Sequence, residues 1–451
     1  MRTKSVNSLL STLLAVGMLV LSGCAIDKQY ASERDFWKAD VAIKKIVRER
    51  SGKLKDADYE KIIGIYRKVI RKYPFEMLSV KAQFSIANLY MVLKKPDDAI
   101  KELRGVIQNF STTPKIATQA QFAIGKIYES RGDYKAALQE FESIIDLYPL
   151  SVIGAETPLY MIRMTSAIED KEAKERAYKK AIRHYSKLIN EYSDTNVALG
   201  IQDYLARAHV EGERWSDAIQ TWDTILEKDI KGPLAAKALL ARASIYATKL
   251  NDTEKAAEIY KDFLEKYPTQ EHLGVRARLA LVECLREQGA SNEEVIEGYK
   301  EIRKSYPDNP MAWGIPYLIF QHYNHIDDNS GSEEALQKAI AEYTKEFNEA
   351  PKGQKQLTIA RLLILCYNET KDWDALINLL RKLATDYPDE PRYLLSIASI
   401  YGNQLNKPDQ AIETYKEAME KFSSLEQIVV VAQAQIDSLN NKSSENITLE
   451  Q

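Results

Sequence analysis

The sequence predicts an all-α fold, an α-solenoid (superhelix) of about ten stacked helical hairpins that ends in a capping helix. Three observations lead to this prediction. The chain of 451 residues is longer than one hydrophobic core usually supports, which favours several domains or a repeat array. Only 18 glycines and 14 prolines interrupt a composition rich in helix-forming residues. One helical segment recurs about every 35 to 44 residues, a period typical of helical repeat proteins.

Residues 131–149, RGDYKAALQEFESIIDLYP, show the repeated unit most clearly. Gly132 suits the left-handed end of a preceding helix, Asp133 suits the N-cap of the next helix, and Pro149 stops it. Between these residues the apolar side chains recur at steps of three and four, which places them on one face of a helix. These side chains are Tyr134, Ala137, Leu138, Phe141, Ile144, Ile145 and Tyr148. The unit is therefore helix, tight turn, helix, stop.

The Tyr-Pro ending of this unit returns along the chain. It occurs at Tyr73-Pro74, Tyr148-Pro149, Tyr267-Pro268, Tyr306-Pro307 and Tyr387-Pro388, with weaker versions between them. A proline cannot continue a helix, and it biases the residue before it away from helical dihedral angles. We therefore interpret Tyr-Pro as the wedge and stop of a hairpin rather than as a site of chemistry.

This pattern resembles the tetratricopeptide repeat family, in particular the slightly long variety found in bacterial envelope proteins. The resemblance covers about residues 30–422. A small residue follows the turn, where the family packs neighbouring helices closely: Ala99, Ala137, Ala218, Ala256, Ala335, Ala375 and Ala411. An aromatic residue that matches the family's wedge stands about four positions later: Phe141, Trp222, Tyr260 and Tyr415.

The first 24 residues differ from the rest. Arg2 and Lys4 precede an apolar run from Leu9 to Val20, which is too short to span a bilayer but suits a signal peptide. The run ends in Leu21, Ser22, Gly23 and Cys24, which resembles the bacterial lipoprotein lipobox. That resemblance implies cleavage before Cys24, a diacylglyceryl group on its thiol and an acyl chain such as palmitate on its amine. Two or three chains anchor durably, since each buried methylene contributes about 0.8 kcal/mol.

The predicted organisation has five segments. They are a lipoprotein signal peptide (1–23), a lipidated tether (24–30), the solenoid (31–422), a capping helix (424–439) and a disordered tail (440–451). In the first hairpin we expect residues 31–48 to form the first helix, before the polar stretch RERSGKLKDAD. The capping helix is expected because an uncapped end repeat would expose its stacking face.

The sequence carries no strong signal for catalysis or for a cofactor other than the lipid on Cys24. It contains no phosphate loop, dinucleotide fingerprint, nucleophile elbow or HExxH pair. A net charge of −3 gives no reason to expect nucleic-acid binding. The segment 327–334, DDNSGSEE, fails as a calcium loop because its glycine falls at a ligand position. We therefore expect no enzyme activity, no metal, no nucleic acid and no small-molecule substrate.

Histidine and cysteine residues do not change this expectation. His322 and His325 lie three residues apart on a predicted helix, but two imidazoles are too few for a typical zinc site. Cys284 and Cys366 lie among apolar residues, so we expect buried free thiols that behave as small hydrophobic side chains.

Two repeats depart from the pattern. The fourth and the eighth are longer, and each carries a proline early in its first helix, Pro158 and Pro316. We expect a local change of curvature there. Trp313 falls outside the repeat pattern, and we predict that Trp313, Tyr317 and His322 contact a partner.

The features together predict a non-enzymatic scaffold that binds other envelope proteins or peptide segments through the groove of the solenoid. The segment 72–100 resembles the repeat lipoprotein of the outer-membrane β-barrel assembly machinery, although this chain has about twice as many repeats. Repeat lipoproteins of secretin pores and exopolysaccharide exporters have a similar build. Because Ala25 follows the lipidated cysteine, we expect anchoring to the outer membrane with the body in the periplasm, or to the outer face of a single membrane. The alternative is a cell-wall or division factor that binds peptidoglycan or its synthases.

Overall fold

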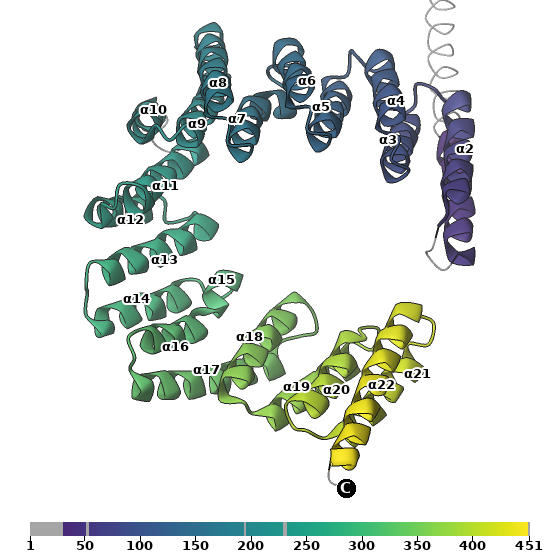
Figure 1. Ribbon diagram of the computed structural model, residues 1–451. Coiled ribbons are helices and arrows are strands. Elements are labelled where there is room, and N and C mark those ends of the chain that lie inside the picture. Colours follow the sequence, from purple (N-terminus) through teal and green to yellow (C-terminus); the bar gives the residue numbers. More distant parts are fainter. Residues whose placement is uncertain (1–29, 51–53, 194, 229–231, 450–451) are drawn as a thin grey trace, which may run out of the picture. The chain divides into compact units, whose positions relative to one another are not determined.

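The computed structural model describes residues 30–50, 54–193, 195–228 and 232–449 (Figure 1). All regular secondary structure within these ranges is α-helical, and within each of the two units described below neighbouring helices pack against each other as antiparallel hairpins. The predicted all-α solenoid is therefore confirmed. The lipobox, the signal peptide and Cys24 lie outside the described residues.

The chain divides into two compact units, Met1–Lys228 and Asp229–Gln451. In the first unit a helix over residues 30–49 precedes α2 (Asp56–Lys72), α3 (Met77–Val92), α4 (Pro96–Asn109), α5 (Pro114–Ser130), α6 (Tyr134–Leu147), α7 (Val152–Ala167), α8 (Lys171–Glu191), α9 (Asn196–Glu211) and α10 (Trp215–Lys228). These helices form hairpins one to five.

The second unit contains hairpins six to ten and one further helix. Its helices are α11 (Pro233–Thr248), α12 (Thr253–Lys266), α13 (Glu271–Glu287), α14 (Asn292–Ser305), α15 (Pro310–Trp313), α16 (Ile315–His325), α17 (Asn329–Glu349), α18 (Gln354–Thr370), α19 (Trp373–Asp386), α20 (Arg392–Asn403), α21 (Pro408–Lys421) and α22 (Glu426–Leu449). The expected helix over residues 31–48 is confirmed by the helix over 30–49 of the first unit.

The local signals of the repeated unit act as expected. Asp133 caps α6 by accepting a hydrogen bond from the backbone N–H of Ala136 at 3.0 Å. Gly132 is left-handed with φ 76°, and α6 ends at Leu147, immediately before the Tyr-Pro pair. The same left-handed turn closes hairpins two to ten, mostly with other residues: Lys94, Glu169, Glu213, Asn251, Gly289, Asp327, Lys371 and Asn406.

The two recurring positions that carry the family resemblance lie in the core of the hairpins. The small residues after the turn are buried where helices cross, except Ala375, which is half-buried. The aromatic wedges Phe141, Trp222, Tyr260 and Tyr415 are buried as well. Cys284 and Cys366 are free and buried, as predicted. Because each hairpin buries its apolar stripe against its neighbours, the core runs along each unit.

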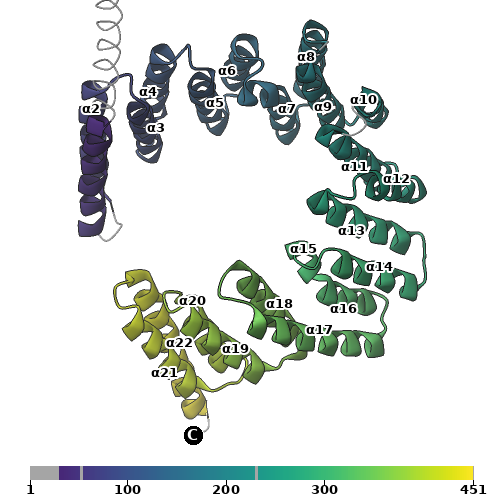
Figure 2. The same ribbon diagram turned by 180° about the vertical axis from the view of Figure 1, so that it is seen from behind.

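The two irregular repeats gain their length in the second helix. α8 and α17 each have 21 residues, whereas α6 and α14 have 14. In hairpin four Pro158 lies inside α7. In hairpin eight the first helix is interrupted at Gly314, so that the short α15 and α16 form an angled pair (Figure 2). The expected change of curvature at these repeats stays a prediction.

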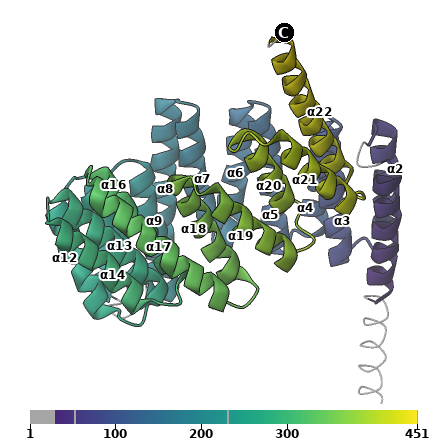
Figure 3. The same cartoon turned by 90° about the horizontal axis from the view of Figure 1, so that it is seen from below.

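The C-terminal helix is longer than the sequence analysis predicts. A capping helix was expected over 424–439, followed by a disordered tail over 440–451. The helix α22 instead continues to Leu449 and projects past the hairpin of α20 and α21 (Figure 3). The reason is that residues 426–449 contain no proline or glycine, and each added residue gains one helical hydrogen bond. None of the described helices combines the length and apolar character that a membrane span requires.

Candidate functional site

A groove in the first unit is a candidate binding surface. It has a volume of about 450 Å³ and lies mainly between α3 and α5, with Ile153 of α7 at one end. Apolar side chains form its floor: Phe84, Ala87, Met91, Leu103, Phe122, Ala123 and Ile127. Exposed polar side chains stand around it: Asn88, Gln119, Lys126 and Ser130. Such a lining suits an apolar side chain carried by a peptide backbone, because the rim can satisfy backbone polar groups.

The floor of the groove is fixed by an aromatic cluster beneath it. The rings of Phe122, Phe141 and Tyr160 meet with centroids 5.0 to 5.1 Å apart. Gly125 allows this contact, because a Cβ atom there would lie only 2.4 Å from the ring of Phe141. Tilted and edge-on ring contacts of this kind add to the gain from burial. The groove therefore has a preformed floor.

One wall of the groove carries a paired cation. The Nζ atom of Lys126 donates a hydrogen bond to the Tyr160 hydroxyl at 2.6 Å and lies 2.9 Å from a carboxylate oxygen of Glu129. Tyr160 also donates to Glu129. Burial, together with this acceptor, raises the pKa of Tyr160, so the phenol stays protonated. The wall therefore offers hydrogen-bonding groups with little net charge.

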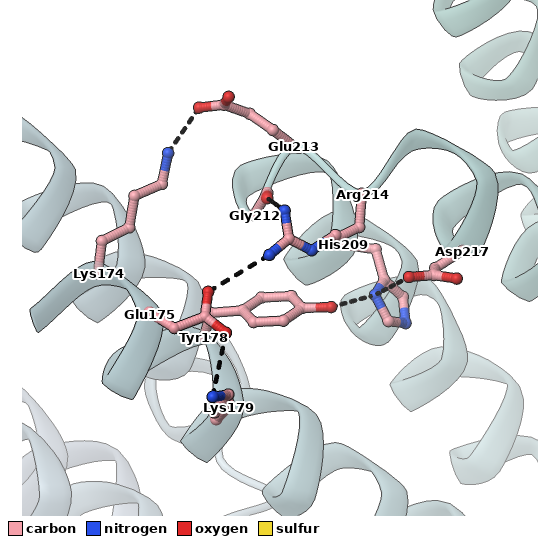
Figure 4. A network of polar contacts seen from close by, with 9 residues as sticks. All are labelled: Lys174, Glu175, Tyr178, Lys179, His209, Gly212, Glu213, Arg214 and Asp217. Atoms are coloured by element: carbon pink, nitrogen blue, oxygen red, sulfur yellow. Dashed lines mark hydrogen bonds and ion pairs between the residues drawn. The ribbon is translucent and has the colours of Figure 1, made fainter. Parts of the chain in front are cut away.

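A second polar cluster joins hairpins four and five (Figure 4). The hydroxyl of Tyr178 in α8 hydrogen-bonds with Nδ1 of His209 in α9 at 3.0 Å, and Asp217 of α10 lies 4.0 Å from the same nitrogen. Arg214 lies over the Tyr178 ring at 5.6 Å. The ring also packs on Gly212, where a Cβ atom would come within 2.5 Å of it. Beside the cluster is a cavity of about 350 Å³.

The order tyrosine, histidine, carboxylate invites comparison with a catalytic relay. A catalytic tyrosine nucleophile would need a lowered pKa, whereas burial raises the pKa of Tyr178. Burial likewise lowers the pKa of His209, which keeps the imidazole neutral near pH 7. We interpret the cluster as a structural link between two hairpins. Within the described ranges, no three His, Cys, Asp or Glu side chains come together as metal ligands would.

The residues predicted to contact a partner lie mostly in the core of the second unit. Trp313 is 6% exposed, and its indole N–H donates to the Pro307 carbonyl at 2.9 Å. His322 is also 6% exposed. The expectation that these two residues face a partner is wrong, because the break at Gly314 turns Trp313 inward and α16 buries His322. Tyr317 is half-buried, and its hydroxyl donates to Glu369 at 3.0 Å.

The groove between α3 and α5 was not predicted from the sequence. A signal was present, because residues 77–92 are apolar around almost the whole circumference of the helix rather than along one stripe. A helix of that kind has more apolar surface than two flanking helices cover. Phe84 and Met91 are the residues that this excess places in the groove.

Family models match parts of the chain. Tetratricopeptide repeat models match residues 205–271 and 391–420, and the model of the soluble NSF attachment protein, SNAP, matches residues 76–221. Tetratricopeptide repeats are therefore present in the chain. The SNAP match includes the groove between α3 and α5. No curated protein matches the chain.

Several solved structures are similar to the chain at low identity. A chain of Naa15/Naa10 bound to HypK-THB is 15% identical with a TM-score of 0.29, covering 88% of this chain and 66% of that one. The C-terminal part of a TPR repeat-containing protein from Cytophaga hutchinsonii is 18% identical with a TM-score of 0.33, covering 62% and 98%. Yeast Tom70 is 10% identical with a TM-score of 0.33, covering 93% and 99%.

Proposed function

We propose that this chain is a lipid-anchored scaffold of the bacterial cell envelope that holds a peptide segment of another envelope protein in the groove between α3 and α5. A tetratricopeptide solenoid fits a protein–protein interaction scaffold. The observation that carries the proposal is the groove itself, with its fixed aromatic floor and its rim of polar side chains, in which the charge of Lys126 is paired with Glu129. The expected partner segment carries one or two large apolar side chains.

The anchor is the second part of the proposal. The order of basic residues, apolar run and Leu21-Ser22-Gly23-Cys24 supports lipidation of Cys24, and Ala25 supports retention at the outer membrane with the body in the periplasm. A Cys24→Ser variant should leave the membrane fraction and appear in the soluble periplasm. A variant that still sediments with membranes would contradict the lipid anchor. Assembly of an outer-membrane or export complex is the envelope role that this build supports.

Site-specific crosslinking in cells tests the groove. A photoreactive amino acid at Asn88, which is exposed at the rim, should give a discrete crosslinked product. The matched control is Gln139, which is exposed on the second helix α6 of the same unit. A Met91→Glu change should abolish the product at Asn88, because it places a carboxylate on the apolar floor.

The crosslinked products distinguish the scaffold role from the cell-wall or division role. Equal crosslinking at Asn88 and Gln139, or a product that survives Met91→Glu, would contradict the groove as the binding site. Identification of the product by mass spectrometry separates a barrel-assembly or export component from a peptidoglycan synthase. The latter result would favour the alternative of a cell-wall or division factor. We propose no enzyme activity, because the Tyr178–His209 cluster holds both groups neutral.

A further inference from the structure

The helix over residues 30–49, which opens the first unit, has a covered face and an uncovered face. The covered face holds the buried residues Ser32, Ala39 and Ile46, and Ala39 packs against Val69 and Tyr73 at the end of α2. Phe36 meets Tyr66 of α2 with ring centroids 6.1 Å apart. Asp35 accepts a hydrogen bond from the hydroxyl of Tyr73 at 2.9 Å. The orientation of the helix on α2 is therefore fixed by packing and by hydrogen bonding.

The opposite face carries large apolar side chains. Tyr30, Trp37 and Val41 are 66%, 63% and 44% exposed. They follow one another at steps of seven and four, so they lie on one stripe of the helix, away from Ala39. Tryptophan and tyrosine favour surroundings that are apolar at one end and wet at the other, as at the headgroup level of a bilayer.

Cations flank this stripe. Five basic side chains lie on or beside it: Arg34, Lys38, Lys44, Lys45 and Arg48. The same helix carries four acidic residues, Glu33, Asp35, Asp40 and Glu49, and Asp35 lies 3.6 Å from Arg34, so the helix has an excess of one positive charge on a chain whose net charge is −3. Lys44 and Lys45 lie 2.8 Å and 3.8 Å from Asp40 and Glu49, yet their side chains stay 72% and 76% exposed. An anionic surface can therefore approach them.

The other end of the chain provides a contrast within the same molecule. The helix α22 also exposes apolar side chains, with Val430 60% and Val431 50% exposed. Residues 426–440, however, contain no lysine or arginine, and their only charged residues are Glu426 and Asp437. A terminal helix of this solenoid therefore need not be basic or carry tryptophan. Of the two terminal helices, the one over residues 30–49, nearest to Cys24, has both an exposed tryptophan and flanking basic side chains.

Chain length brings this helix to the bilayer. Cys24 and Tyr30 are six residues apart, and a fully extended chain spans at most about 3.5 Å per residue, or about 20 Å in all. A lipid on Cys24 therefore holds the helix within a short distance of the headgroups. Tethering makes a second contact effectively intramolecular, so even a weak surface interaction is occupied.

We propose that the face of Tyr30, Trp37 and Val41, with its flanking cations, lies on the bilayer and recognises anionic phospholipid headgroups. This proposal rests on the proposed lipidation of Cys24. The lipid supplies the anchoring, and the face sets the orientation of the first unit at the membrane surface.

The test uses the full-length lipidated protein reconstituted into vesicles. An environment-sensitive fluorophore is attached at Val41→Cys, and at Val430→Cys as the matched control. Cys284 and Cys366 are buried and remain unlabelled. The vesicles contain either phosphatidylcholine alone or phosphatidylcholine with phosphatidylglycerol, together with a headgroup spin-labelled lipid that quenches the fluorophore. We expect quenching at position 41 in phosphatidylglycerol vesicles and little quenching at position 430.

Charge reversal sharpens the test. The changes Lys44→Glu, Lys45→Glu and Arg48→Glu together should lower quenching at position 41 at least about twofold, since each basic residue near an anionic surface adds to the attraction. The control reverses three exposed lysines elsewhere, Lys135→Glu, Lys171→Glu and Lys345→Glu, and should leave quenching unchanged. High salt should act like the first set, because it screens exposed charges.

Each contrary outcome has a separate meaning. Protein that floats with the vesicles but shows no quenching at position 41, or equal quenching without phosphatidylglycerol, overturns the proposed face while the anchor stands. Protein that does not float with vesicles overturns both proposals. A doubled mass in detergent that is lost on charge reversal would identify the face as a contact with a second copy, which also overturns the proposal.

Discussion

Hairpins four and eight are the two irregular repeats, and they accommodate a proline in the first helix in different ways. Each has a proline in its first helix, a second helix of 21 residues and a fully buried tyrosine in that helix. In hairpin four α7 continues through Pro158. In hairpin eight the chain breaks at Gly314, and Pro316 becomes the second residue of α16. A cavity of about 460 Å³ lies beside this break, between α14, α16 and α17.

The two buried tyrosines form different hydrogen bonds with the backbone of the first helix. Tyr185 of α8 donates a hydrogen bond to the carbonyl of Ala155 at 2.6 Å, in the turn of α7 that Pro158 disturbs. Tyr343 of α17 instead accepts a hydrogen bond from the backbone N–H of Tyr317 at 3.1 Å, in the first turn of α16. A hydroxyl can do either, which is why a tyrosine suits both places. The long second helix thus supports the first helix at opposite backbone groups.

Replacing the prolines should give the largest difference between the two hairpins. Inside α7 the ring of Pro158 crowds the carbonyl of Gly154, a cost of about 3 kcal/mol in a helix interior. Pro158→Ala should therefore stabilise α7 against local opening by up to about 3 kcal/mol. Pro316→Ala should change α16 by less than about 1 kcal/mol, because proline is tolerated in the first turn. Hydrogen exchange of peptides from each helix measures the free energy of local opening of α7 and of α16. Equal changes in the two free energies would contradict the expected difference between the two hairpins.

Removing the tyrosine hydroxyls should have the next largest effect. Tyr343→Phe leaves the N–H of Tyr317 without a partner, since the first N–H groups of a helix have none within it, and should cost about 1 to 3 kcal/mol. Tyr185→Phe should cost about 1 kcal/mol, because the Ala155 carbonyl lies inside α7 and can keep its helical donor. Urea unfolding monitored by hydrogen exchange gives both values. A larger loss for Tyr185→Phe would reverse the proposed roles.

Much of this architecture was predictable because its signals are local. Pro158 and Pro316 mark the two irregular hairpins, and Asp133 and Gly132 mark a cap and a turn, since each acts within a few residues. The outcome at Trp313 was not predictable. Whether that indole faces solvent depends on the angle between α15 and α16, which the packing of several helices decides.

Long-range partners could not be read from the sequence either. Tyr148 was interpreted as a wedge and stop, and it does end α6, but its hydroxyl also donates to the carbonyl of Ser111 in the preceding hairpin at 2.9 Å. In the same manner, the Tyr387 hydroxyl accepts a hydrogen bond at 2.8 Å from the backbone N–H of Gly353, in the loop between hairpins eight and nine. Such bonds depend on the rotation between repeats. The groove between α3 and α5 depends on the same rotation.

Acid should weaken both hairpin four and hairpin eight. Burial lowers the pKa of both His184 and His322 below the ordinary 6.5, so the unfolded chain takes up protons first as the pH falls. The stability of each hairpin is therefore full above pH 6.5 and declines below it, by at most about 1.4 kcal/mol per pH unit for each histidine. Nearby cations add repulsion at both imidazoles, Arg286 and His325 at His322 and Lys180 and Lys187 at His184, where Asp146 partly offsets it.

Hydrogen exchange between pH 7 and pH 5, corrected for the intrinsic exchange rate, measures this decline. His322→Gln should flatten the decline in α16, and His184→Gln should flatten it in α8. The slope rather than the absolute stability is the informative quantity, because either substitution can also disturb packing. An unchanged slope in both variants would mean that other groups carry the acid sensitivity.

The turns of the two hairpins should show the smallest difference. Glu169 and Asp327 occupy the left-handed turn position with φ 58° each, where hairpins three and seven have Gly132 and Gly289. A left-handed conformation costs most side chains about 1 kcal/mol, but aspartate tolerates it better than glutamate. Glu169→Gly should therefore stabilise hairpin four by about 0.5 to 1 kcal/mol, and Asp327→Gly should leave hairpin eight nearly unchanged. If both changes gave the same gain in urea unfolding, backbone strain at the turn would be equal in the two hairpins, and their difference would lie only in the proline-bearing helices.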